Sequence, residues 1–125
     1  SYVDKLEQPE GKGNDELLME RIMKAVNKNL SNSDINVDML TQKVGISRAQ
    51  LHRKMKEMTG ISTSEFIRNI RLEQAARLLR EQKINVTQVA YTVGFSNLAH
   101  FSTIFRKHFG IAPSEYAEKN CETDA

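Results

Sequence analysis

The sequence predicts an all-α protein of about seven helices, in which two helix-turn-helix units are joined by one long helix. Apolar side chains recur at the three- and four-residue spacing of amphipathic helices from residue 15 onward. Glycines and helix-capping residues divide the chain into short helical segments, and no segment alternates between apolar and polar residues as a strand does. Two segments also repeat each other, which indicates a duplicated unit.

The two ends of the chain are expected to be tails, and one helix precedes the repeated units. Residues 1–14 are polar, contain Pro9 and lack a helical period, so they predict a linker or a disordered tail. Residues 121–125 are expected to be a second tail. An amphipathic helix of about 15 residues is expected from Asp15, with Asn14 or Asp15 as its cap.

The first helix-turn-helix unit is expected at about 37–59. A short helix over 37–44 ends at Gly45, and Ser47 opens a second helix that ends at Gly60. Gln50 stands three residues after Ser47, which is the spacing of a capping box.

A linker helix is expected at about 63–82, because a wide apolar stripe follows a second capping-box pattern at residues 62–65. We expect the opposite face of this helix to carry four arginines: Arg68, Arg71, Arg77 and Arg80.

The second helix-turn-helix unit is expected at about 86–109. Asn85 is expected to cap a short helix, Gly94 to form the turn, and Ser96 to cap the helix that completes the unit. Pro113 suits the first turn of a last short helix.

The two units repeat each other in sequence. NVDMLTQKVGIS at 36–47 matches NVTQVAYTVGFS at 85–96, and MTGISTSEF at 58–66 matches HFGIAPSEY at 108–116. One such pattern is typical of any helical corner. Two copies in register, on either side of a long helix, favour a pair of helix-turn-helix units.

The glycine in each copy marks the turn between the two helices of the unit. Gly45 and Gly94 stand where the chain must change direction sharply, and glycine adopts a positive φ there at little cost. Ser47 and Ser96 then begin the second helix, whose N-terminal end enters the major groove of DNA in helix-turn-helix proteins.

The chain resembles the AraC-type DNA-binding domain in two stretches, GISRAQLHRKMKEMTGISTSEFIRNIRLEQAARLL and INVTQVAYTVGFSNLAHFSTIFRKHFGIAPSEY. The most diagnostic pattern, A-x-x-V-G-F-S-x-x-x-x-F-S-x-x-F-[RK]-[RK]-x-F-G-x-x-P-x-x-Y, is matched from Ala90 to Tyr116. The resemblance covers about residues 30–118, and it implies a DNA-binding domain over about residues 15–120. The lead-in and first helix resemble the segment that joins a receiver domain to this output domain in hybrid two-component regulators.

The resemblance implies which side chains read base edges. In the first unit these positions correspond to Ala49, His52 and Arg53, with Arg48 beside them. Arg53 is the leading candidate, because a guanidinium can bond guanine O6 and N7 together. In the second unit the candidates are Asn97, Ala99, His100 and Thr103. Many AraC-type domains carry Arg or Lys where Thr103 stands, so we expect this unit to position the duplex more than it selects the sequence.

Charge and length are consistent with a DNA partner. Residues 37–120 hold 13 basic and seven acidic residues, a balance of +6, between two acidic ends. A linker helix of about 18 residues is roughly 27 Å long, which is near the helical pitch of B-DNA at about 34 Å. Candidate phosphate contacts are cations and serines at helix starts: Ser47, Lys54, Lys56, Ser96, Arg106 and Lys107.

Other function classes find little support in the residues. His52, His100 and His108 lack Cys or His partners at metal-ligand spacing, and no Ser-His-Asp or Cys-His group forms a catalytic motif. We therefore expect no metal, no cofactor and no enzymatic activity. The sequence has one cysteine, no signal peptide and no apolar run long enough to cross a membrane, so a soluble cytoplasmic protein without membrane contact is expected.

The expected partner is double-stranded DNA, with RNA polymerase as a candidate second partner. The chain begins at Ser1 rather than Met, so upstream receiver or kinase domains of the same chain are expected. It would then be the C-terminal output domain of a bacterial hybrid two-component regulator. Two alternatives stay open: a helical protein-interaction module that uses the same basic face, and a stand-alone AraC-type regulator without an upstream sensor.

Overall fold

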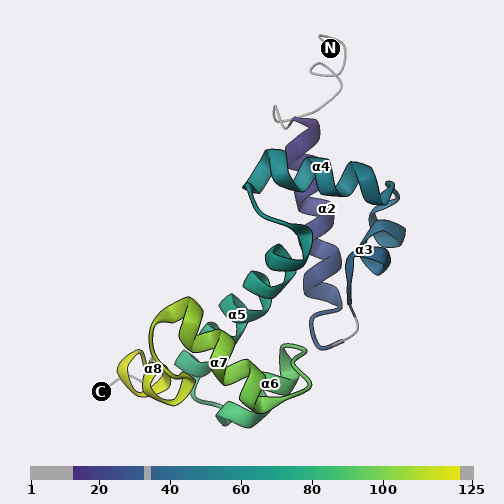
Figure 1. Cartoon of the computed structure of the whole chain (residues 1–125). Coiled ribbons are helices and arrows are strands. Elements are labelled where there is room, and N and C mark those ends of the chain that lie inside the picture. The colour runs from purple at the N-terminus through teal and green to yellow at the C-terminus, as the bar shows by residue number, and fades with distance from the viewer. Residues whose placement is uncertain (1–12, 33–34, 122–125) are drawn as a thin grey trace.

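The computed structural model describes residues 13–32 and 35–121, and seven α-helices lie within them (Figure 1). The helices are α2 (Asn14–Lys28), α3 (Val37–Val44), α4 (Arg48–Thr59), α5 (Thr63–Glu81), α6 (Val86–Thr92), α7 (Leu98–Phe109) and α8 (Pro113–Lys119). No strand occurs in this part of the chain, so the predicted all-α class is confirmed. Most of the two expected tails, residues 1–12 and 122–125, lies outside the described residues.

Two separate apolar cores lie on either side of α5. We call α2–α4 the N-terminal lobe and α6–α8 the C-terminal lobe. In the N-terminal lobe the core includes the fully buried Ile22, Leu40 and Leu51. In the C-terminal lobe it is built around the fully buried Phe101 and Phe105. Each lobe therefore has an apolar interior of its own, although both are small.

The long helix α5 belongs to both cores, because its apolar side chains point in two directions. Ile67 and Ile70 pack into the N-terminal core, whereas Leu72, Ala75 and Leu79 pack into the C-terminal core. This explains why the apolar stripe in the sequence is so wide. Among the described residues, every extensive contact between helices lies within one lobe or involves α5. Figure 1 shows α5 running from one lobe to the other.

The first helix, α2, is part of the N-terminal lobe. Ile22 and Val26 on its inner side are fully buried. The cap expected from Asn14 or Asp15 is wrong, because Gly13 holds the N-cap position and the helix already begins at Asn14. Gly13 has the extended backbone that a cap requires, with φ −77° and ψ 169°, so the two polar residues after it fall into the first helical turn.

The expected arginine face of α5 is wrong for Arg71. Arg68 and Arg77 are exposed and Arg80 is half-buried, but Arg71 is only 6% exposed. Position 71 lies where the apolar stripe of α5 crosses from one core to the other, so both lobes cover it. The side chain donates hydrogen bonds to backbone carbonyl oxygens of the segments that cover it.

The turn at Gly94 is shaped by this buried arginine. Gly94 has a φ of 96°, a conformation that favours glycine. A Cβ atom built on Gly94 would lie 1.6 Å from Arg71 Nη1 and 2.3 Å from the Leu30 carbonyl oxygen. Glycine is therefore required at position 94 for two reasons: the positive φ strains other residues, and a side chain would occupy the place of the guanidinium.

We expect Gly94→Ala to destabilise the protein much more than Gly60→Ala does. Gly60 has a similar φ of 79°, but nothing lies within 4 Å of a Cβ built on it. Both variants should lose about 1–2 kcal/mol through left-handed strain, and Gly94→Ala should lose about 1–3 kcal/mol more through overlap with its neighbours. Denaturant unfolding of the two variants measures the difference, and equal losses would show that Arg71 does not need the space at Gly94.

Candidate nucleic-acid interface

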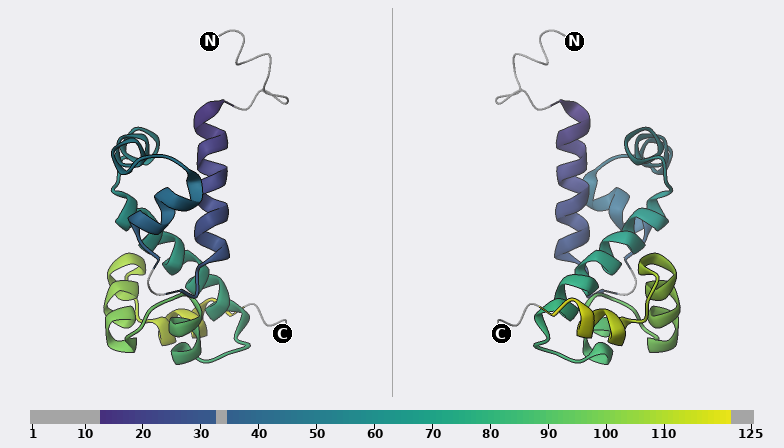
Figure 2. Two further views of the ribbon diagram at one scale, coloured as in Figure 1. Left: turned by 90° about the vertical axis from the view of Figure 1, so that its right-hand side faces the viewer. Right: turned by 90° about the vertical axis from the view of Figure 1, so that its left-hand side faces the viewer.

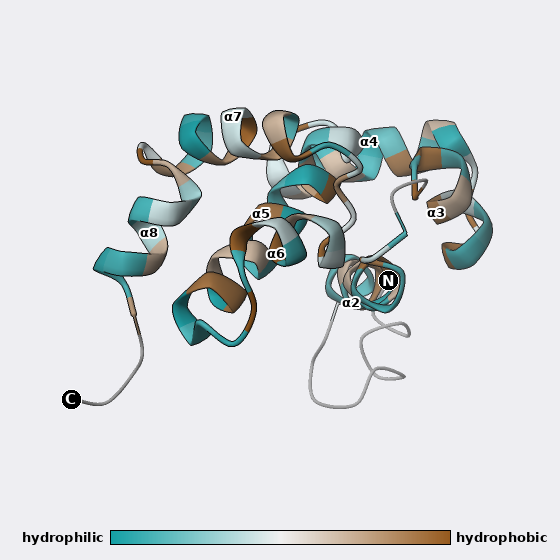
Figure 3. Cartoon of the chain, turned by 90° about the horizontal axis from the view of Figure 1, so that it is seen from below, coloured by the Kyte–Doolittle hydropathy of each residue, from teal (hydrophilic) through white to brown (hydrophobic). Residues whose placement is uncertain are grey.

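The two helices expected to read DNA lie on the same face of the molecule. In both views of Figure 2, α4 and α7 stand on one side of α5 while α2 stands on the other. Seen from below in Figure 3, α4 and α7 form one edge of the molecule, and α2 and α6 lie toward the opposite edge. One flat or gently curved partner can therefore touch both helices.

The helix α4 is fixed at its N-terminal end by a complete capping box, as the sequence predicted. The Ser47 hydroxyl accepts a hydrogen bond from the Gln50 backbone N–H at 3.1 Å, and the Gln50 side-chain oxygen accepts one from the Ser47 N–H at 3.3 Å. Leu51 and Met55 anchor the inner side of α4 in the core, and both are fully buried. The rotation of α4 about its axis is therefore set by packing.

This packing leaves one polar stripe of α4 exposed to solvent. All the base-reading candidates of the first unit lie on that exposed stripe, together with one lysine: Arg48, Ala49, His52, Arg53 and Lys56. Two of the arginines form ion pairs within the chain, Arg48 with Asp38 at 2.5 Å and Arg53 with Glu57 at 3.9 Å. Exposed pairs of this kind are worth little, so both guanidiniums can exchange their partners for a ligand at small cost.

Lys54 points away from that stripe and toward α2. Its Nζ lies 3.0 Å from the Asp15 carboxylate and 3.5 Å from that of Glu57. The hydrogen bond and charge of Asp15 raise the pKa of Lys54, so the ammonium form is favoured further. The contact joins α2 to α4, and the expected phosphate contact of Lys54 stays a prediction.

The helix α7 begins one residue later than the sequence predicted. Asn97, not Ser96, is its N-cap, and the Asn97 side-chain oxygen accepts a hydrogen bond from the His100 N–H at 2.9 Å. The helix starts three residues after Gly45 in the first unit but four residues after Gly94 in the second. The extra residue moves Ser96 out of the cap position, and Asn is as good a cap as Ser.

Aromatic packing holds the inner side of α7. The rings of Phe101 and Phe105 are fully buried, and the Phe101 ring centre lies 5.1 Å from that of Phe95, the residue that follows the turn glycine. The outward candidates of the second unit are all exposed: Asn97, Ala99, His100, Thr103, Arg106 and Lys107. The Thr103 hydroxyl donates to the Ala99 carbonyl at 3.0 Å, so only its oxygen lone pairs stay available to a ligand.

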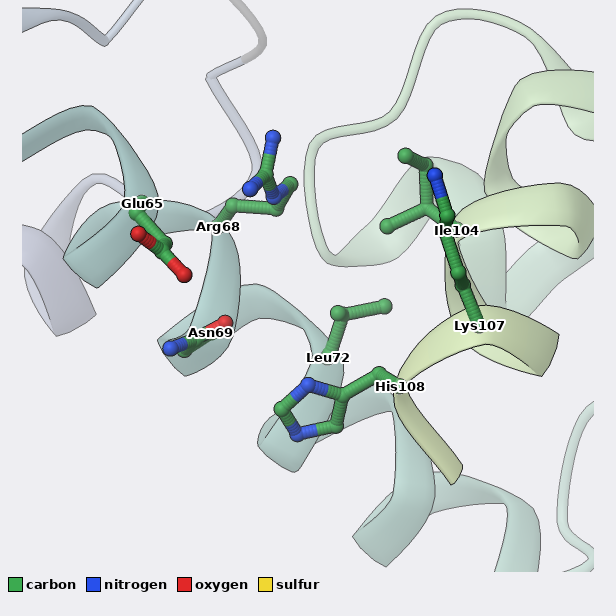
Figure 4. A pocket seen from close by; sticks show the side chains of 7 residues that line it. All are labelled: Glu65, Arg68, Asn69, Leu72, Ile104, Lys107 and His108. Carbon is green, nitrogen blue, oxygen red and sulfur yellow. The ribbon is translucent and has the colours of Figure 1, made fainter. Parts of the chain in front are cut away.

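A cleft of about 220 Å³ separates α5 from α7 (Figure 4). It is lined by Glu65, Arg68, Asn69, Leu72, Ile104, Lys107 and His108. Arg68 lies on the α5 side of the cleft, Lys107 and Ile104 lie together on the α7 side, and Leu72 lies between them (Figure 4). His108 is exposed, and its Nε2 lies 3.4 Å from the Glu73 carboxylate.

Arg68 is one of the four arginines that the sequence predicted on one face of α5. Its side chain is exposed and has no ion-pair partner among the described residues. It stands on the helix that connects the two candidate reading helices. A polyanion that touches both α4 and α7 must pass the helix between them. An outward-facing arginine on the linker helix is therefore the sequence signal that could have identified Arg68 as a candidate contact.

The three histidines lie apart. His52 and His100 are exposed on α4 and α7, and His108 pairs with Glu73. Within residues 13–32 and 35–121, no group of three or more His, Cys, Asp or Glu side chains could hold a metal ion. None of the helices described is long and apolar enough to cross a membrane.

Sequence comparisons relate the chain to known regulators. A family model described as a helix-turn-helix domain matches residues 40–119. The chain is 40% identical over 108 residues to histidine kinase P4 of Formosa agariphila, covering 86% of this chain and 8% of that protein. It is 37% identical over 82 residues to the transcriptional activator RhaS of Escherichia coli, covering 66% of this chain and 30% of RhaS. The chain thus spans a small part of both relatives.

Three solved structures of regulatory proteins share the fold. An AraC-type transcriptional regulator of Chromobacterium violaceum superposes with a TM-score of 0.80 at 26% identity, covering 90% of this chain and all of that one. The C-terminal domain of AraT, a response regulator of Geobacillus stearothermophilus, gives 0.79 at 27%, covering 90% and 93%. The DNA-binding domain of AdpA in complex with a target DNA gives 0.73 at 26%, covering 82% and 90%.

We expect Asn97→Ala to destabilise the protein by about 1 kcal/mol, because it removes the cap of α7. Ser96→Ala is the matched control, since Ser96 is exposed and precedes the cap, and it should change the free energy of unfolding by less than about 0.5 kcal/mol. Urea unfolding of both variants measures this difference. A larger loss for Ser96→Ala would return the cap to the position that the sequence predicted.

Proposed function

Because the chain belongs to the AraC-type helix-turn-helix family of DNA-binding transcription regulators, we propose that α4 and α7 read two successive major-groove segments of one duplex. The observation that carries this proposal is the placement of both helices on one face (Figures 2 and 3). The polar stripe of each helix is also exposed. A single chain can then bind a site in double-stranded DNA without a second copy.

The length of α5 supports this geometry. Its 19 residues span about 28 Å at 1.5 Å per residue. Successive major-groove segments on one side of B-DNA lie about 34 Å apart. In the N-terminal lobe α4 contacts α5, and in the C-terminal lobe α7 contacts α6 and α8, which pack on the other half of α5. The spacing between α4 and α7 is therefore of the order that two adjacent grooves require.

We assign base reading in the first unit to the exposed stripe of α4, with Arg53 in the leading role. Arg48, Ala49 and His52 stand beside it, and Lys56 is assigned to phosphate. Ser47 heads this helix, so free backbone N–H groups at its start are also available to a phosphate.

The second unit is assigned a larger share of backbone contact. Arg106 and Lys107 are exposed cations on α7, and we add Arg68 on α5 as a further phosphate contact between the two units. The candidates for base reading remain Asn97, Ala99, His100 and Thr103. The side-chain oxygen of Asn97 already accepts the hydrogen bond that caps the helix. Ser96 remains a phosphate candidate that precedes the cap.

We further propose that this domain is the output end of a longer cytoplasmic signalling protein, with RNA polymerase as its second partner. The similarity to histidine kinase P4 and to the C-terminal domain of the response regulator AraT supports an upstream receiver or kinase. Sequencing the whole reading frame tests this point. A frame that encodes this domain without a sensor would favour a stand-alone regulator.

Selection of bound sites from a pool of random duplexes tests the DNA proposal directly. We expect a recurring site with two conserved segments about one helical turn apart. Binding to the selected duplex should weaken by roughly 1,000-fold between 50 and 200 mM salt if about six phosphates are contacted. Equal binding to every duplex would reduce the function to non-specific association. Binding that responds neither to sequence nor to salt would favour a protein-interaction module.

We expect Arg53→Ala to relax the base preference at one position of the selected site, with a loss of about 1–3 kcal/mol of discrimination there. Lys56→Ala is the control on the same exposed stripe. It should weaken binding to all duplexes alike and lower the salt dependence by about one phosphate contact. Competition assays with duplexes varied at each position measure both effects, and uniform weakening by Arg53→Ala would assign Arg53 to phosphate instead.

A further inference from the structure

The two lobes approach each other where the connector after α2 meets the turn before α7. The Leu30 side chain of this connector packs against both apolar cores. Apart from α5, which both lobes share, this junction is one place among the described residues where one lobe bears on the other. It therefore influences how the two lobes are oriented about α5.

Arg71 is the centre of this junction. Its Nη1 donates hydrogen bonds to the Leu30 carbonyl at 2.5 Å and to the Val93 carbonyl at 2.7 Å, and its Nη2 donates to the Asn32 carbonyl at 2.8 Å. Leu30 and Asn32 belong to the connector that follows α2, whereas Val93 belongs to the turn of the second helix-turn-helix unit. One guanidinium thus binds both lobes from its place on the helix between them.

The chemistry of a guanidinium makes this junction directional. Its donors lie in a rigid plane, so each acceptor must be in a particular place. Burial lowers the pKa of Arg71 below its ordinary value, but an arginine stays charged at neutral pH. A buried cation without good acceptors is costly, and the bonds to Leu30 and Val93 can both form only while the two lobes keep their observed relation.

The bond to Val93 lies close to the reading end of α7. Val93 is followed by Gly94, whose missing side chain leaves room for the guanidinium, and then by Phe95, Ser96 and the cap residue Asn97. A shift of the Val93 carbonyl must therefore move the start of α7, which carries the proposed base-reading side chains. Because the same guanidinium also bonds the Leu30 and Asn32 carbonyls, it fixes the start of α7 relative to the N-terminal lobe.

We propose that Arg71 is a positioning residue that sets the spacing between the two DNA segments that the chain accepts. It acts by holding the start of α7 in a fixed relation to the lobe that carries α4. The inference rests on the proposed reading of DNA by α4 and α7. It assigns no contact between Arg71 and DNA, since the side chain is buried.

The first test compares Arg71→Met with Arg77→Met on the selected duplex and on duplexes with one base pair inserted or removed between the two segments. Arg77 lies on the same helix, and its bonds among the described residues go only to Gln74 and Glu81 of α5 itself. For the unmodified chain and for Arg77→Met, the altered spacing should weaken binding about tenfold or more. For Arg71→Met this penalty should fall below about threefold, because the lobes can adjust.

Duplexes with one segment scrambled separate positioning from a general loss of structure. Binding to each single segment should be unchanged in Arg71→Met, since each lobe keeps its own core. Arg71→Lys keeps the charge but lacks the planar fork, so it should lower the spacing penalty partly. If Arg71→Met does not fold, Arg71→Lys is used in its place. All binding is measured well below the melting temperature of each variant.

A second test does not depend on DNA. Spin labels at Gln42→Cys on α3 and Glu118→Cys on α8, in a Cys121→Ser background, report the distance between the lobes. Both labelled positions are exposed. The distance distribution should broaden in Arg71→Met or Arg71→Lys and stay narrow in Arg77→Met.

The two tests distinguish failure of this inference from failure of the proposed function. If no duplex is selected, the DNA proposal fails, and a broadened label distribution would still support a positioning role for Arg71 between the lobes. If a duplex is selected and a folded Arg71 variant keeps the full spacing penalty and a narrow distribution, Arg71 only stabilises the fold and the inference is overturned.

Discussion

The structure depends on the burial of one helix by two cores. Because α5 gives Ile67 and Ile70 to one lobe and Leu72, Ala75 and Leu79 to the other, neither lobe can move far without exposing part of that helix. Because the hydrophobic effect is not directional, this burial holds the two lobes close to α5 but determines their relative orientation less well. Orientation comes from polar contacts with defined geometry, and the bonds of Arg71 supply these at the crossing point of the two cores.

The exposed stripes of α4 and α7 follow from what is buried beneath them. Leu51 and Met55 determine which side of α4 faces outward, and Phe101 and Phe105 do the same for α7. The cap residues Ser47 and Asn97 determine where each helix begins. A single polar stripe on a helix is common. Here two helices with such stripes lie on one face and belong to duplicated units, and this combination favours the proposal that they read DNA grooves.

Much of the fold followed from local rules, and the misplaced cap of α7 has a local cause too, whereas the burial of Arg71 has a non-local one. The capping box at Ser47, the turn glycines and the start of α8 at Pro113 were predictable, because each depends on a few neighbouring residues. The cap of α7 was misplaced because both Ser96 and Asn97 suit the role and only the backbone decides between them. The burial of Arg71 could not be predicted, since it depends on carbonyl groups 22 to 41 residues away in sequence. The base and phosphate assignments extend the family resemblance, and the structure adds that most of their side chains are accessible.

The position of α2 has a consequence for the smallest chain that can fold. The family model begins at residue 40, yet Ile22 and Val26 of α2 and Val37 of α3 fill the interior of the N-terminal lobe. A polypeptide trimmed to the matched residues would leave Leu40, Leu51 and Met55 facing water on the side that α2 now covers. The autonomous folding unit is therefore longer than the stretch by which this family is recognised, and any shortened version for biochemical work should keep the whole of α2.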